Sequence, residues 1–332
     1  MTSVYTETNQ DYPNFRTCDI SKAKVRNTGD ISSVFSSFGN VEAEGLPQEY
    51  ADIKKNLVKN EEALTASWHR LKKALADGIN EIKEVGPEII PKLQYSELEN
   101  ASEAQTPQIK KYGAVVIKNV IPKEEAIQLK NDVIDYIDAN PTTKGFPKDK
   151  KVVYELYWSK SQVRARSNPR LMTAMSYMNN LWHASPDSEI CLDQNISYAD
   201  RLRIRNAGDG LFSLGPHADG GSLERWEDEE YSNCYKPIFE GNWENFDPYD
   251  ATHRIEAKMD LHESSGTCSM FRTFQGWLAV SDIAPKEGTI LFAPFVKEVT
   301  AYYMLKPFFD ENDKLKFDSD IPGAFPGKGL EF

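Results

Sequence analysis

Apolar residues recur along residues 47 to 86 with the spacing of one face of an amphipathic helix. Intervals of three, four and seven residues separate them, and the positions between are mostly charged or polar. Pro47 suits the first turn of a helix and Gly86-Pro87 ends the segment. The pattern therefore predicts one amphipathic helix, or two helices in line. Its apolar positions are Tyr50, Ile53, Leu57, Leu64, Trp68, Leu71, Leu75, Ile79 and Ile82.

Strands and helices are predicted to alternate in the middle of the chain. Tyr112–Val120 is rich in Val and Ile and predicts a strand, after which Pro122 opens a helix. Val152–Trp158 predicts another strand. Pro169–Trp182 predicts a helix whose Met and aromatic side chains are typical of core filling. Residues 1–45, in contrast, are polar without a sustained period, which predicts a flexible N-terminal tail.

The last third of the chain predicts antiparallel strands after a long insertion. Residues 223–268 form this insertion, and we interpret the acidic run ERWEDEE near its start as a solvated face. Strand-like segments then follow one another, separated by PKEG and by Val296-Lys297-Glu298, as short turns separate antiparallel strands. These segments are Phe271–Ser281, Thr289–Phe295 and Val299–Leu305.

Composition and charge narrow the classes of function. The net charge of the 332 residues is −12 and no long Lys/Arg cluster occurs, which argues against binding to nucleic acid or to anionic membranes. The four cysteines are far apart and form no C-x-x-C pair, as expected for free thiols in a reducing compartment. Neither a membrane-length apolar run nor an apolar signal core is present. We therefore predict a cytoplasmic protein that acts on a small molecule, and the oligomeric state stays open.

The candidate chemistry centres on His217-Ala218-Asp219. Residues i and i+2 of a strand project from the same side, so an imidazole nitrogen and a carboxylate oxygen can meet at one point. These are two of the three ligands of the 2-His-1-carboxylate triad of non-haem Fe(II) oxygenases. Gly220 and Gly221 follow and allow tight backbone near a ligand. A surface turn closed by the aspartate is the structural alternative.

A row of arginines precedes this motif. Arg203 and Arg205 alternate with Leu202 and Ile204 in a strand-like segment. They are candidates for binding an anionic co-substrate or substrate, although ion pairs with the many carboxylates explain them equally well. Trp226, Gln275 and Trp277 are open to the same two readings, as cavity lining or as core. No residue stands out as a catalytic acid or base.

Four segments resemble the YbiU-like family, which is also named after fungal genes induced by N-acetylglucosamine. They are YGAVVIKNVIPKEEA, RLRIRNAGDGLFSLGPHADGGSLERW, FRTFQGWLAVSD and EGTILFAPFVKEVTAYYMLKPFF. The resemblance covers the chain from about Pro47 to its end. The family is similar in fold to Fe(II)/2-oxoglutarate-dependent oxygenases of the phytanoyl-CoA dioxygenase neighbourhood.

The resemblance implies an α+β fold built on a double-stranded β-helix, a jelly roll of the clavaminate synthase-like type flanked by helices. Residues 46–332 would form this domain, with N-terminal helices at 46–94 and the insertion at 223–268, and Leu202–Asn206 would be an early barrel strand. The resemblance places His217 and Asp219 as the first two ligands of Fe(II), with 2-oxoglutarate as co-substrate. The substrate stays unassigned.

This sequence departs from the family pattern at the second metal histidine. In such oxygenases that histidine lies on a late barrel strand, followed by an Arg or Lys that binds 2-oxoglutarate, but here no histidine follows His262. We expect the domain to lack its last strands, because the chain is a fragment. Two alternatives are an inactive relative, which would bind a ligand without turnover, and replacement of the missing ligand by His253 or His262.

Overall fold

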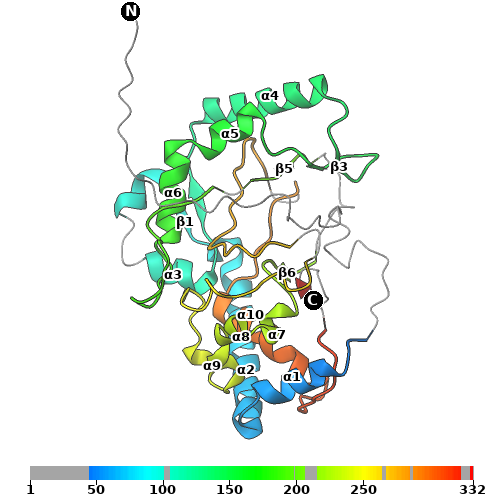
Figure 1. The fold of residues 1–332 in the computed structure, drawn as a ribbon. Coiled ribbons are helices and arrows are strands. Elements are labelled where there is room, and N and C mark those ends of the chain that lie inside the picture. Colours follow the sequence, from blue (N-terminus) through cyan, green and yellow to red (C-terminus); the bar gives the residue numbers. More distant parts are fainter. Residues whose placement is uncertain are drawn as a thin grey trace, which may run out of the picture.

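The computed structural model describes residues 45–100, 105–197, 199–205, 215–263, 267–284, 287–322 and 330–331. The predicted flexible tail, residues 1–45, lies outside this part of the chain apart from Gly45. Helices and a few short strands build the fold (Figure 1). Among the described residues, no helix is both long and apolar enough to cross a lipid bilayer.

The N-terminal amphipathic pattern forms two helices, α1 (Glu49–Leu57) and α2 (Glu61–Val85). The Asn60 side chain caps α2 by accepting a hydrogen bond from the Ala63 backbone N–H at 2.9 Å. Gly86, with φ of +66°, ends the helix at the predicted place. The apolar face of α2 is buried at Leu64, Trp68 and Leu71, as the pattern predicts, whereas Ile79 towards the end of the helix is 51% exposed.

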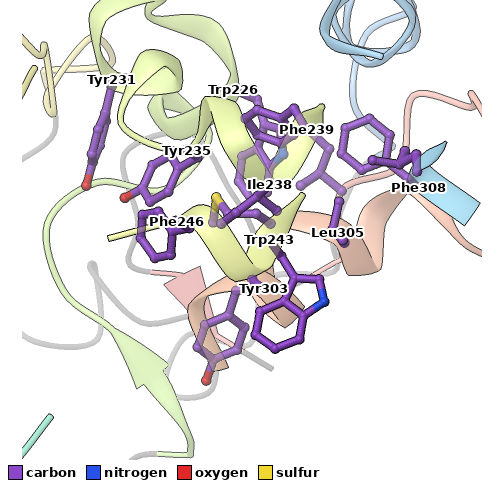
Figure 2. Close-up of a cluster of buried hydrophobic side chains, with 14 of the residues drawn as sticks. Trp226, Tyr231, Tyr235, Ile238, Phe239, Trp243, Phe246, Tyr303, Leu305 and Phe308 are labelled. Carbon is purple, nitrogen blue, oxygen red and sulfur yellow. The ribbon is translucent and has the colours of Figure 1, made fainter. Parts of the chain in front are cut away.

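The largest core lies between these helices and the second half of the chain. Trp68 of α2 stacks on Phe309 and Tyr302, with ring centroids 4.8 and 5.5 Å apart. Figure 2 shows the side of this core formed by aromatic residues from Trp226 to Phe308. The helices that supply it are α7 (Glu224–Glu227), α8 (Glu229–Asn233), α9 (Lys236–Phe239), η5 (Trp243–Asn245), α10 (Val296–Leu305) and η6 (Lys306–Phe308).

A second core lies around a small parallel sheet. Pro169 begins α6 and Pro122 precedes α4, as the sequence predicts. Trp182 packs edge-to-face on Tyr249 and Phe271 in this core. The elements of this region are η3 (Gly86–Ile89), β1 (Lys92–Gln94), η4 (Tyr95–Asn100), α3 (Gln105–Tyr112), β2 (Val116–Lys118), α4 (Lys123–Ala139), α5 (Lys160–Arg166) and α6 (Pro169–Asn179).

The described strands form three small sheets. In the first, β1 and β2 pair in parallel. In the second, β3 (Gly145–Phe146), β4 (Val153–Tyr154) and β5 (Leu202–Arg203) pair antiparallel in that order. In the third, β6 (His217–Ala218) pairs antiparallel with β7 (Leu330–Glu331), so that His217 lies opposite Glu331. Figure 1 shows β6 just beyond the end of the helical group that contains α7 and α10.

Three strand predictions in the last third of the chain are wrong for the described residues. Val299–Leu305 lies in helix α10, with the turn-like Val296-Lys297-Glu298 as its first turn. Burial of Ala301, Met304 and Leu305 against the main core outweighs the β propensity of this segment. Phe271–Ser281 and Thr289–Phe295 have no ladder partner among the described residues, and a strand requires one.

The acidic run that follows the metal motif is also not simply a solvated face. Glu224 and Arg225 are buried together with Trp226, and Asp228 caps α8 through a hydrogen bond from the Tyr231 backbone N–H. Only part of the run, including Glu229, faces solvent. The run therefore belongs to the main core.

Substitution of Gly241 by alanine is expected to destabilise the fold by about 2–4 kcal/mol. Gly241 has φ of +83°, and an added Cβ would lie 2.7 Å from the carbonyl carbon and oxygen of Ala63 in α2. Backbone atoms within a helix cannot move aside cheaply. The free energy of unfolding, measured in urea, checks this prediction. Gly276→Ala is the control, because its Cβ meets nothing within 4 Å, and equal losses in both variants would contradict the argument.

Candidate functional site

The motif predicted to bind metal lies on strand β6 and the loop that follows it. His217 and Asp219 project toward one another, with 3.9 Å between His217 Nε2 and Asp219 Oδ1. Both are accessible, since their side chains are 27% and 47% exposed. Two neighbouring ligand atoms that each bind one metal ion at about 2.1 Å lie about 3 Å apart. The two side chains would therefore have to approach by about 1 Å to occupy neighbouring positions of a single metal ion.

A backbone contact assigns the tautomer of His217. Its Nδ1 lies 2.8 Å from the carbonyl oxygen of Gly215, which can only accept a hydrogen bond. The proton of a neutral imidazole is thereby assigned to Nδ1, and the lone pair to Nε2, which faces Asp219. A carbonyl that receives the remote N–H is the usual partner of a metal-binding histidine. The arrangement is compatible with a metal site and with the alternative of a simple surface turn.

The loop after β6 is held through its backbone. Arg225 donates from Nη2 to the carbonyl oxygen of Asp219 at 2.9 Å, and the Tyr231 hydroxyl donates to that of Gly220. Gly220 and Gly221 have φ of +86° and +85°, a conformation that favours glycine. The sequence-based expectation of tight backbone at these two glycines is confirmed.

Glu224 closes the same loop from the first turn of α7. Its Oε2 accepts a hydrogen bond from the Ser222 backbone N–H at 2.7 Å. Burial raises the pKa of this carboxyl, and the nearby Glu227 adds to the effect, although two backbone hydrogen bonds and His262 oppose it. A carboxyl with a raised pKa retains its proton to higher pH, which is compatible with its fully buried position.

The two candidate arginines have different surroundings. Burial lowers the pKa of the Arg203 guanidinium, as does the charge of Arg205, whereas the Asp219 carboxylate raises it. Arg203 also lies over the ring of Trp277, 4.7 Å from its centroid. Arg205 packs along Gly288, where an added Cβ would lie 2.8 Å from the arginine Cγ. Of the two, Arg203 is the one that the structure brings into electrostatic contact with Asp219.

The structure also gives different surroundings to the three residues that the sequence left open as cavity lining or core. Trp226 belongs to the main core and is 2% exposed. Trp277 is 45% exposed and lies beside Arg203, and Gln275 is also exposed. Only Trp277 is thus placed next to a candidate site residue.

A third metal ligand is not found in the part of the chain that the structure describes. There, no three His, Cys, Asp or Glu side chains gather closely enough to hold a metal ion. His253 contacts Glu230 at 2.8 Å and His262 contacts Glu227 at 2.9 Å. Neither histidine therefore joins His217 and Asp219.

Sequence reasoning missed the residues that support the loop. These residues lie in the predicted insertion, and of them only Arg225 belongs to the acidic run that we interpreted as a solvated face. They are Arg225, Tyr231, Tyr235 and Arg254. Tyr235 and Tyr231 are fully buried, and their hydroxyls contact arginine and backbone groups. The apolar spacing of Leu223, Trp226 and the two tyrosines was the one available signal of burial.

Comparison with known families shows which family this chain belongs to. A model of the Gig2-like family matches residues 44–332, which is most of the sequence. The chain belongs to the Gig2-like family. The resemblance drawn from its four sequence segments is thereby confirmed.

Relatives of this Gig2-like chain are known from bacteria and fungi. YbiU of Escherichia coli K12 is 33% identical over 267 residues, covering 76% of this chain and 62% of the relative. The crystal structure of GIG2, GlcNAc Inducible Gene 2 of Candida albicans, is 33% identical with a TM-score of 0.79, covering 88% of this chain and 66% of that one. The chain thus spans less than two thirds of both relatives.

A third Gig2-like relative carries a functional description. It is a protein of Salmonella typhimurium LT2 described as a candidate oxidoreductase, and it is 29% identical with a TM-score of 0.74. The match covers 87% of this chain and 74% of that one.

Proposed function

We propose that this protein is an Fe(II)/2-oxoglutarate-dependent oxygenase built on a double-stranded β-helix. The observation that carries the proposal is the pairing of His217 Nε2 with Asp219 Oδ1 at 3.9 Å, with the Gly215 carbonyl fixing the tautomer. The similarity to the Salmonella typhimurium protein described as a candidate oxidoreductase supports a redox function. Dioxygen activation coupled to oxidative decarboxylation of 2-oxoglutarate, giving succinate and carbon dioxide, is the chemistry that such a centre supplies when loaded.

The residues of this chain have distinct roles in the proposal. His217 and Asp219 supply one imidazole nitrogen and one carboxylate oxygen, and the third protein ligand comes from outside the described residues. Arg203 is the cation beside Asp219, and it is positioned to bind a carboxylate of the co-substrate or substrate. Trp277 holds the Arg203 guanidinium through its ring face.

Anaerobic titration with Fe(II) and then 2-oxoglutarate tests the proposal. We expect a visible charge-transfer band that requires both components, succinate formation when oxygen is admitted, and loss of both signals with a chelator. Iron binding without a response to 2-oxoglutarate would instead indicate a cupin-like metalloprotein. Absence of iron binding would indicate a binding protein without turnover. Either outcome overturns the proposal.

A further inference from the structure

A buried arginine, Arg225, and a half-buried one, Arg254, converge on the hydroxyl of one tyrosine behind the candidate metal loop. Nη1 of Arg225 lies 2.5 Å from Tyr235 Oη, and Nη1 of Arg254 lies 3.1 Å from the same atom. Tyr235 is 0% exposed and Arg225 is 6% exposed. Figure 2 shows the Tyr235 ring next to that of Tyr231, with 5.6 Å between their centroids.

The two guanidinium groups have no carboxylate partner among the described residues. Neither Arg225 nor Arg254 forms a salt bridge there, and the Nε of each is buried without a hydrogen-bond partner. Besides the bond from Arg225 to the Asp219 carbonyl oxygen, they contact the faces of the Tyr231 and Tyr235 rings, 5.1–5.8 Å from the centroids. Two neighbouring cations that are largely withdrawn from water repel each other, so an anion between them would stabilise the cluster.

We propose that Tyr235 is this anion, a resident tyrosinate whose phenolate oxygen is the shared counter-ion of Arg225 and Arg254. A phenolate can accept the hydrogen bonds of both Nη1 groups at once, and it reduces the net charge of the cluster from +2 to +1. The proton of the phenol is released to solvent on folding.

The groups around Tyr235 support this assignment. Burial alone would raise the pKa of the Tyr235 phenol, but the Arg225 and Arg254 guanidiniums outweigh burial and hold that pKa below its ordinary value. Burial raises the pKa of the adjacent Cys234 thiol, of the Tyr231 phenol and of the Tyr303 phenol near Arg225, so these three groups stay neutral. Of these four groups, Tyr235 is the one whose ionisation the surroundings favour.

The tyrosinate also has a consequence for the site, which rests on the proposed function. Arg225 donates one Nη to Tyr235 and the other to the Asp219 carbonyl oxygen at 2.9 Å. The Tyr235 phenolate thus holds the Arg225 guanidinium in place. That guanidinium in turn holds the backbone of Asp219, the candidate metal ligand. We assign Tyr235 as a positioning residue for Asp219.

Ultraviolet difference spectroscopy of the metal-free protein tests the tyrosinate without reference to iron. At neutral pH we expect the absorption of one tyrosinate per chain, out of 15 tyrosines. The band should disappear when the protein is unfolded in urea at the same pH, because Tyr235 then regains its ordinary pKa. This measurement needs no variant, and an identical spectrum before and after unfolding would overturn the proposal.

Variants assign the signal to the residue. Tyr235→Phe should remove the band, and Tyr249→Phe, a buried tyrosine of the second core that serves as the control, should keep it. Arg254→Gln should move the ionisation of Tyr235 upward by at least about one pH unit, which corresponds to tenfold in the equilibrium constant. Because the folded-state pKa is lowered, the free energy of unfolding should rise with pH from that pKa to about 10 in the wild type, and less so in Tyr235→Phe.

The two proposals fail separately. Absence of the band would refute the tyrosinate without bearing on iron binding by His217 and Asp219. The counter-ion of Arg225 and Arg254 would then be another anion. If the band is present but Tyr235→Phe binds iron and 2-oxoglutarate as tightly as the wild type does, the positioning role is refuted while the tyrosinate stands.

Discussion

Replacement of His217 by alanine is expected to abolish Fe(II) binding and to lower 2-oxoglutarate-dependent turnover by more than about 100-fold. The variant loses the imidazole nitrogen that faces Asp219 at 3.9 Å, and a lone carboxylate holds ferrous iron weakly. Asp219→Asn should have a comparable effect, because it removes the negative charge and keeps the shape. Anaerobic metal titration and succinate formation measure both effects.

His69→Ala is the matched control for this prediction. His69 is exposed on α2 and takes no part in the candidate site. Its replacement should leave both iron affinity and turnover at the wild-type level. If His217→Ala bound iron as tightly as His69→Ala does, the metal would be elsewhere and the site assigned to β6 would be wrong.

Replacement of Trp68 by alanine is expected to lower the free energy of unfolding by about 3–5 kcal/mol. Trp68 is 2% exposed and stacks on Phe309 and Tyr302, so truncation leaves a large cavity between α2 and the C-terminal part of the described chain. Its Nε1 also donates a hydrogen bond to Asp313 at 2.8 Å, which alanine cannot make. Urea denaturation followed by circular dichroism measures the loss.

Two further variants separate the causes of this loss. Trp158 is 75% exposed and contacts the Arg166 guanidinium at 4.8 Å, so Trp158→Ala should cost no more than about 1 kcal/mol. Trp68→Phe keeps an aromatic ring but loses the hydrogen bond, and should fall between the two alanine variants. Equal stability of Trp68→Ala and Trp158→Ala would mean that α2 does not anchor the main core.

Sequence patterns correctly predicted the secondary-structure elements that depend on residues only a few positions apart. The 3.6-residue spacing located α1 and α2, and proline and glycine located the start of α6 and the end of α2. The His217-x-Asp219 pair was predicted for the same reason, because alternation along a strand is a local property. The strand predictions failed where pairing or burial by distant segments decides, as at Val299–Leu305 in α10.

Neither the jelly roll nor the metal triad follows from the described part of the chain alone. Sheets are formed by residues distant in sequence, and β6 finds its described partner in β7, more than a hundred residues later. A third ligand, in the proposed site, would likewise be a long-range contribution. The family membership is what links the local motif to a complete site.

The sequence by itself determined the helical face of α2, the closeness of His217 to Asp219 and the family. The tertiary structure decided which charged groups are buried and what they contact. Lys54 illustrates this: it lies in α1 among polar positions, yet it is 0% exposed and donates to Asp318 at 2.7 Å and to the carbonyls of Pro307 and Asp320. The Arg225–Tyr235–Arg254 cluster is another case. Periodicity reports which side of a helix is apolar, but the partner that stabilises a buried charge comes from a remote segment, and only the folded chain brings the two together.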